Sequence, residues 1–318
     1  MKNPTITLMK GICILLVVAG HAGCPLTKFI YLFHMPVFFM ISGYLFKREY
    51  FKNKQSLVLL FHKRILRLWV PYVITNMFFL LLSGFTLSKD FFYKALKILF
   101  FCCEPPLGDA SWFLGTLFSV TILFACISYI LSSLNNKRVF VVQTILAISL
   151  LYFSYFCQTQ SIDVKLVFLR VFSVYIIFYL GYLYQYKNMC ANWPFTLFSG
   201  IAGGIILLFF RNIDINLGSN IYTNPPSLII VSIAGWHFIY LLADIGKKSP
   251  VFFSVFSYIG NHTMPILLFH WLCFSLIGMV LPHCVWWLKT LLAVIISLGC
   301  YALWNKLKHL LYATETSK

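Results

Sequence analysis

The stretch WFLGTLFSVTILFACISYILSSL, residues 112–134, decides the fold class of this chain. It runs for 23 residues without a charged side chain, and about 20 apolar residues in an α-helix are enough to cross the hydrocarbon core of a bilayer. The stretch does not alternate between apolar and polar residues as a strand of a membrane barrel would. A helix also satisfies its own backbone hydrogen bonds in lipid. We therefore predict a transmembrane helix here.

Runs of the same kind follow one another along the whole chain. Of the 318 residues, 60% are hydrophobic and only 10% are charged, and a water-soluble domain of this size could not cover that much apolar surface. The sequence therefore predicts an all-α fold, a polytopic transmembrane helix bundle of about ten spans that forms one domain over residues 1–318. The ten predicted spans are Ile6–His21, Phe29–Phe46, Leu68–Leu87, Trp112–Leu134, Val139–Phe156, Leu166–Tyr186, Phe195–Phe210, Leu228–Ile245, Ile259–Leu281 and Val285–Trp304.

The net charge of +17 comes from Lys and Arg residues in short connections between the apolar runs. In a water-soluble protein such a charge would suggest nucleic acid, but here it is a topology signal and we expect no nucleic-acid partner. The positive-inside rule predicts that both termini are cytoplasmic, with residues 47–67 as the strongest determinant. Residues 87–111 then form the longest external segment. No large soluble segment lies between the spans, so any chemistry is expected in or beside the membrane.

Lys10 and His21 in the first predicted span need a reason, because ionisable groups within membrane helices are costly and tend to line functional cavities. They are eleven residues apart, about three helical turns, so they project from nearly the same face, roughly 16 Å apart along the axis. One interpretation is a polar stripe that ends in an imidazole near the outer surface. The alternative is that Lys10 snorkels to the inner interface and His21 lies at the outer one.

The next two spans also carry polar residues. The second contains FHMPVFF at residues 33–39 and ISGY at residues 41–44; Pro36 and the Ser42–Gly43 pair allow a kinked helix that neighbours approach closely, and His34 is expected near the outer side. Before the third span, Arg64 and Arg67 are three residues apart and would share a helix face. Such a pair can bind phosphates. The simpler interpretation is a basic patch that sets the membrane topology or contacts lipid headgroups.

Taken together, these residues resemble the membrane-bound acyltransferase family 3. The resemblance covers most of the chain and is most specific over residues 10–72. The family pattern has Arg where this chain has Lys10, so the charge is kept and the bidentate geometry is lost. Some members carry an acidic residue where this chain has Leu117, so a partner for the base must come from elsewhere here or be dispensable. The matching motifs are Lys10-Gly11, His21, residues 33–39, Ser42-Gly43-Tyr44, Arg64-x-x-Arg67 with Pro71-Tyr72, Ser111-Trp112-Phe113-Leu114, and GNHTMPILLFH at residues 260–270.

The resemblance implies transfer of an acyl group, most often acetyl, from cytoplasmic acyl-CoA to a hydroxyl of a cell-surface glycan, lipid-linked sugar or similar acceptor in a bacterial inner membrane. It implies His21 as the catalytic base, because an imidazole titrates near neutral pH. Arg64, Arg67 and Lys10 are expected to bind the CoA co-substrate. His34, Ser42, Trp112 and His270 are expected on the substrate side, with His270 either in the site or a hydrogen-bonded packing residue. No permanently bound cofactor and no metal is expected, and membrane lipids are the expected surroundings.

Two other functions also fit a polytopic membrane protein with internal histidines. One is a transporter or flippase of a glycan or lipid intermediate, and the other is a glycan polymerase. Metal catalysis would require His21, His34 and His270 to converge, and no ligand spacing supports it. Consumption of the thioester distinguishes an acyltransferase from a transporter.

Overall fold

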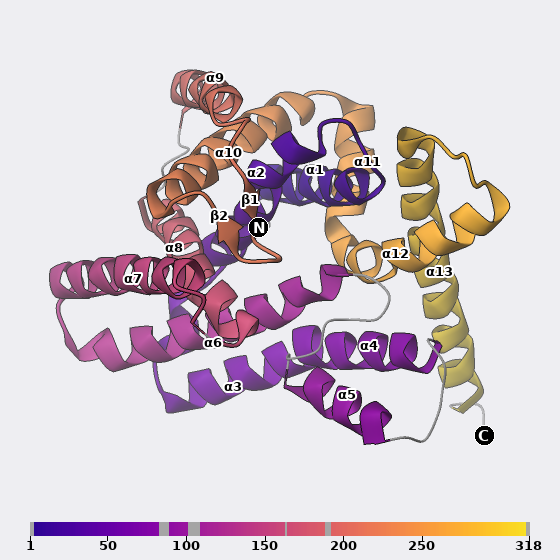
Figure 1. Cartoon of the computed structure of the whole chain (residues 1–318), viewed down its shortest axis with the longest axis horizontal. Helices are drawn as coiled ribbons and strands as arrows, with labels where there is room; N and C mark the ends of the chain where they lie inside the picture. The colour runs from indigo at the N-terminus through magenta and orange to yellow at the C-terminus, as the bar shows by residue number, and fades with distance from the viewer. Residues whose placement is uncertain (1–2, 83–88, 101–108, 163, 188–191, 316–318) are drawn as a thin grey trace. The chain divides into compact units, whose positions relative to one another are not determined.

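The structure is a computed structural model that describes residues 3–82, 89–100, 109–162, 164–187 and 192–315. Helices make up nearly all of these residues (Figure 1). The predicted all-α fold is therefore confirmed.

Eight helical segments of the described chain are long and apolar enough to cross a membrane, where the sequence analysis expected about ten. The other two predicted spans are also helical, as α2 (Thr27–Tyr44) and α9 (Trp193–Phe209). Lys28 and His34 dilute the apolar composition of α2, and the 17 residues of α9 reach only about 25 Å at 1.5 Å per residue. The eight segments are Pro4–His21, Lys54–Leu82, Trp112–Ser133, Asn136–Thr159, Leu166–Gln185, Pro225–Gly246, Thr263–Val280 and Trp286–Leu303.

The chain divides into two compact units. The first unit comprises Met1–Ile30 and Ala243–Lys318, and the second comprises Tyr31–Leu242. The predicted single membrane domain stays a prediction.

The first unit is built around α1 (Pro4–His21), which contacts α11 (Pro250–Asn261), α12 (Thr263–Val280) and α13 (Trp286–Glu315). The Asn3 side chain caps α1 by accepting a hydrogen bond of 3.0 Å from the backbone N–H of Thr5, as residues of this type do at helix starts. Beyond His21, Gly23 has a φ of +89°, a conformation that glycine adopts readily. Local sequence therefore sets both ends of the helix that carries His21.

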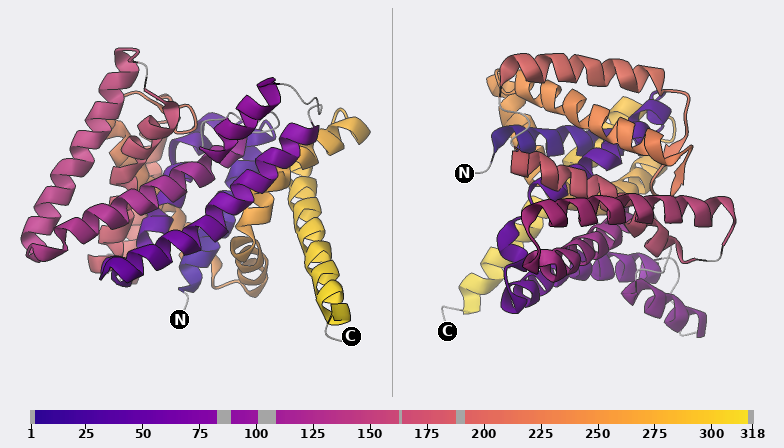
Figure 2. Two further views of the ribbon diagram at one scale, coloured as in Figure 1. Left: turned by 90° about the horizontal axis from the view of Figure 1, so that it is seen from below. Right: turned by 90° about the vertical axis from the view of Figure 1, so that its left-hand side faces the viewer.

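The second unit contains one continuous 29-residue helical segment, Lys54–Leu82 (Figure 2). It consists of α3 (Lys54–Arg64), a π-helical turn η2 (Ile65–Trp69) and α4 (Val70–Leu82). The predicted start of this span at Leu68 is wrong. Asn53 caps the helix by accepting from the N–H of Ser56 at 2.8 Å, so the basic residues that the sequence analysis placed in a connection are helical. The predicted end at Leu87 lies outside the described residues.

The segment expected as a long external loop also contains a helix, α5 (Lys89–Leu99). Its exposed Lys94 and Asp90 form an ion pair of 2.7 Å, and the Trp69 indole N–H donates to the Leu99 carbonyl oxygen at 3.1 Å. An amphipathic helix can lie along a surface without spanning the membrane. At 11 residues with mixed charges, α5 is too short and too polar to be predicted as a membrane span.

Close helix contacts hold the rest of the second unit together. A Cβ atom at Gly43 in α2 would collide with the carbonyl oxygen of Phe178 in α8 (Leu166–Lys187). A Cβ atom at Gly181 in α8 would collide with the carbonyl oxygen of Met40 in α2. The predicted close approach at the Ser42–Gly43 pair is thus confirmed. The remaining helices of this unit are α6 (Trp112–Ile130), α7 (Asn136–Thr159), α8 (Leu166–Lys187), α10 (Pro225–Gly246) and the short 3-10 helices η1 (Arg48–Phe51), η3 (Asp109–Ser111) and η4 (Leu131–Ser133).

A small hairpin joins α9 to α10. Its strands β1 (Ile215–Asn216) and β2 (Ile221–Tyr222) pair antiparallel, with Ile215 opposite Tyr222. Between them, Asn220 has a φ of +55°. Two-residue strands leave too little periodicity for sequence analysis to detect.

A buried polar network fixes this hairpin on α7 and α8. Ser173 donates to the Asn220 amide oxygen at 2.7 Å, and the Asn220 amide donates to Ser154 at 3.0 Å. The Tyr222 hydroxyl donates to the Leu151 carbonyl oxygen at 3.3 Å. Burial raises the pKa of Tyr222, so this hydroxyl keeps its proton for that bond.

Candidate active site

Two histidines meet in the first unit. His21 is the last residue of α1 and is half-buried, whereas His270, midway along α12, is completely buried. Nδ1 of His21 lies 2.9 Å from Nε2 of His270. The ring centroids are 5.2 Å apart, with 11° between the planes. The structure therefore brings together the predicted catalytic base and one predicted substrate-side histidine.

A third group determines which nitrogens carry hydrogen. Nδ1 of His270 lies 2.9 Å from the Ile266 carbonyl oxygen, one turn earlier in α12. A carbonyl oxygen only accepts, so Nδ1 of His270 must be the donor. The neutral ring of His270 then has its lone pair on Nε2, and His21 must donate to it from Nδ1. In this arrangement the basic lone pair of a neutral His21 is on Nε2.

Trp271 lies against the same imidazole. Its ring centroid is 5.2 Å from that of His21, with 36° between the planes. The indole Nε1 is buried and has no hydrogen-bond partner among the described residues. Buried donors usually have a hydrogen-bond partner, so this indole N–H is a candidate polar group of the site. The sequence analysis missed Trp271, although its position directly after His270 was the available signal.

Lys10 shares α1 with His21 and is also half-buried. The helix is unbroken between the two residues, so the rise of 1.5 Å per residue keeps them roughly 16 Å apart along the axis, as expected. Its assignment to the CoA co-substrate stays a prediction.

Arg64 and Arg67, in the second unit, differ in their surroundings. Arg64 is half-buried and its Nε has no hydrogen-bond partner among the described residues, whereas Arg67 is exposed. The π-turn η2 begins between them, at Ile65. A π-turn is wider than an α-turn, and the predicted shared face of Arg64 and Arg67 stays a prediction. Both remain candidates for phosphate binding.

His34 and Ser42 lie in α2 with internal contacts. The buried ring of His34 lies 5.1 Å from that of Tyr31. Ser42 donates from its hydroxyl to the Phe38 carbonyl oxygen at 2.9 Å, within the helix. This bond gives Ser42 a role in the helix itself, and a substrate role for either residue stays a prediction.

Trp112 begins α6 and packs against a cation that the sequence analysis did not single out. The guanidinium of Arg170, in α8, lies 5.3 Å from a ring centroid of Trp112, within the range of a cation–π interaction. The ring face under Arg170 is therefore covered, and a sugar would have to use another surface of the indole. A charged residue inside the predicted span Leu166–Tyr186 was the signal that could have identified Arg170.

Among the residues that the structure describes, no group of three or more His, Cys, Asp or Glu side chains is arranged to hold a metal ion. His34 belongs to the second unit and the pair His21–His270 to the first. Of the three predicted site histidines, His21 and His270 are the two that the structure joins by a hydrogen bond.

A family model described as "Acyltransferase domain" matches residues 3–304, nearly the whole chain. The chain belongs to the acyltransferase 3 family. The membrane acyltransferase resemblance noted from the motifs is thus confirmed, and the protein is a multi-pass membrane protein of an acyl-transferring family. No match was found among curated proteins or among solved structures. The matched residues include both members of the histidine pair in this acyltransferase.

Proposed function

We propose that this acyltransferase transfers an acyl group from cytoplasmic acyl-CoA, with acetyl-CoA as the first candidate donor. The proposed acceptor is a hydroxyl of a cell-surface glycan, lipid-linked sugar or similar molecule at the inner membrane. The observation that carries the proposal is the chain of hydrogen bonds from His21 through His270 to the Ile266 carbonyl oxygen. In the neutral form of His21 this chain of hydrogen bonds leaves the reactive lone pair on Nε2. Family membership supports acyl transfer as the reaction.

In the proposed reaction, Nε2 of His21 takes the proton of the acceptor hydroxyl as its oxygen attacks the thioester carbonyl carbon. The new C–O bond forms and the C–S bond breaks, so CoA leaves as a thiolate. The thiolate then takes the proton back from the imidazolium of His21. The products are the O-acyl ester and CoA with a free thiol, and His21 is again neutral.

His270 acts as a positioning residue in this scheme. When His21 is protonated, its Nδ1–H still donates to His270 Nε2, and His270 still donates to Ile266. This second hydrogen bond polarises the first. The role resembles that of the carboxylate that orients a catalytic histidine in a hydrolase triad, with a neutral ring in place of the acid.

Trp271 supplies a hydrogen-bond donor beside the base. As the acceptor oxygen attacks, negative charge develops on the thioester oxygen, and a fixed donor stabilises that charge. We assign this role to the indole N–H of Trp271, because it is a buried donor next to His21 with no partner in the described chain. Arg64, Arg67 and Lys10 are the residues proposed for the CoA end of the donor.

The test uses the purified chain in lipid vesicles with labelled acetyl-CoA and a crude glycan or lipid fraction as acceptor. Label in the acceptor fraction together with an equal amount of released CoA thiol supports the proposal. A transporter would leave the thioester intact. Thioester consumption that persists unchanged in His21→Ala would remove His21 from the mechanism.

A further inference from the structure

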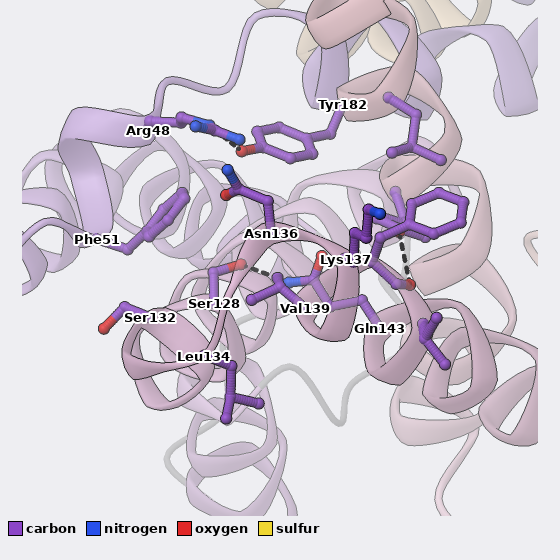
Figure 3. Close-up of a pocket in the computed structure, with 14 residues that line it drawn as sticks. Arg48, Phe51, Ser128, Ser132, Leu134, Asn136, Lys137, Val139, Gln143 and Tyr182 are labelled. Atoms are coloured by element: carbon purple, nitrogen blue, oxygen red, sulfur yellow. Dashed lines mark hydrogen bonds between the residues drawn. The ribbon is translucent and has the colours of Figure 1, made fainter.

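A cavity of about 630 Å³ lies within the second unit (Figure 3). It is bounded by the 3-10 turn η1, the end of α6 with η4, the start of α7, and α8. None of the residues named for the acyl-transfer site lines it. The lining of the cavity is therefore distinct from the residues proposed for acyl transfer.

One end of the cavity is cationic. Nε of Arg48 donates to the Tyr182 hydroxyl at 3.2 Å, which holds the guanidinium at the cavity wall (Figure 3). Lys137, in the first turn of α7, lines the same cavity and is exposed. No acidic side chain is found among the described residues of the lining. Two cations from different helices therefore line the same cavity.

The start of α7 adds to the positive potential. This helix is 24 residues long, and Asn135 caps it by accepting from the Arg138 N–H at 2.9 Å. The aligned peptide dipoles of a long helix place a partial positive charge at its N-terminus. The amide of Asn136 also lines the cavity. The polar end is thus suited to an oxyanion such as a phosphate.

The lining of the cavity also contains apolar residues. It includes Phe140 and Val141, whose side chains are 44% and 51% exposed. Only 22% of the most apolar window of α7 is buried inside the protein, which leaves most of this predicted span open to lipid contact. A ligand that fills this cavity must therefore combine an anionic head with an apolar part.

We infer that the cavity binds an anionic phospholipid, with its phosphate between Arg48 and Lys137 and its acyl chains along Phe140 and Val141. A soluble phosphorylated compound would match the cations but would leave the exposed apolar wall uncovered. The predicted orientation places both cations at the cytoplasmic face, where anionic lipids are concentrated. The inference does not depend on the acyl-transfer reaction.

The test measures binding of dioctanoyl phosphatidylglycerol to the purified full-length protein in detergent by native mass spectrometry. Dioctanoyl phosphatidylcholine and free CoA are the comparison ligands. Phosphatidylglycerol is expected to bind at least tenfold more tightly than phosphatidylcholine. Lys137→Gln and Arg48→Gln should each weaken its binding about fivefold, which corresponds to one lipid–cation contact.

Arg138→Gln is the matched control, because Arg138 follows Lys137 on α7 and does not line the cavity. It removes the same charge and should change binding less than twofold. Lys137 is exposed, so its substitution leaves the fold intact even if Arg48→Gln does not. Equal binding of the two lipids would overturn the inference. An equal loss of phosphatidylglycerol binding in Arg138→Gln would also overturn it, and so would tighter binding of CoA than of phosphatidylglycerol.

Discussion

The reactivity of an imidazole depends on the contact made by its other nitrogen. In this acyltransferase Nδ1 of His21 is held by His270, and the Ile266 carbonyl oxygen orients His270 in turn. A partner of the proposed base is thus a second histidine, whereas some family members carry an acid in the region of Leu117. Three residue-scale predictions follow from this contact and from the neighbouring indole.

His21→Ala is expected to insert and fold as the unaltered protein does, because His21 is a half-buried helix-end residue. Loss of a general base reduces rates by about 10²–10⁴-fold, and acyl transfer should fall by that factor. The measurement is release of CoA thiol from acetyl-CoA in vesicles. Activity within threefold of the unaltered protein would contradict the proposed role.

His270→Gln and His270→Leu separate orientation from packing. A glutamine amide oxygen can accept from Nδ1–H of His21, whereas leucine fills a similar volume without an acceptor. We expect His270→Gln to retain at least tenfold more kcat/KM than His270→Leu. Equal losses in the two variants would show that His270 serves packing alone.

Trp271→Phe keeps an aromatic ring beside His21 and removes the indole N–H. If that N–H stabilises the developing oxyanion, kcat should fall by about 10²-fold with little change in KM, as for other single oxyanion donors. Steady-state kinetics with acetyl-CoA check this. A change confined to KM would assign Trp271 to donor or acceptor binding instead.

At the scale of elements, the position of α1 depends on its contact with α11. A Cβ atom at Gly260 would collide with the Thr7 carbonyl oxygen, and one at Gly11 would collide with the Phe256 carbonyl oxygen. The two helices therefore approach through glycines on both sides, as small residues allow in membrane helix pairs. This contact involves the same helix that ends in His21.

Gly260→Ala is expected to push α1 and α11 apart and to lower the free energy of unfolding by about 1–3 kcal/mol, the usual cost of overpacking. Thermal unfolding in detergent measures the effect. Gly278→Ala is the matched control, because a Cβ atom there meets nothing within 4 Å. The control should be neutral or slightly stabilising, as Ala is favoured over Gly within a helix by about 0.5–1 kcal/mol. Similar midpoints for the two variants would contradict the close contact.

Some helix boundaries can be predicted from nearby residues and others cannot. Asn53 and Asn135 each cap a helix, and caps are read from a few residues. The span starting at Lys54 was nevertheless expected to start at Leu68, because Lys63, Arg64 and Arg67 were placed at its inner entrance and not within it. Long basic side chains can lie on a helix and reach water at its end, so charge alone does not end a helix.

At the scale of the whole molecule, charge placement predicts the orientation in the membrane. Basic residues cluster at the start of α7, at Lys137 and Arg138, and the positive-inside rule places that end in the cytoplasm. The opposite end of α7 is then outside. Both termini are cytoplasmic on the same argument.

Single cysteines at the two ends of α7 test this orientation. In intact cells a membrane-impermeant maleimide is expected to label Gln160→Cys above the level of the parent chain, because Gln160 is exposed at the predicted outer end. Ser133→Cys, exposed near the other end, should be labelled only after the membrane is opened. The reverse pattern would invert the predicted topology.

The sequence by itself determined the helical membrane architecture and the family, because each depends on residues close together in the chain or on motifs read in order. Only the tertiary structure decided that His21 and His270, 249 positions apart, share a hydrogen bond, and that Arg48 meets Tyr182 across 134 positions. Apolar periodicity tells which residues form a helix, but it does not tell which face of one helix packs on which face of another. That choice depends on the fit of side chains and glycines between helices, and such fit exists only in the folded molecule.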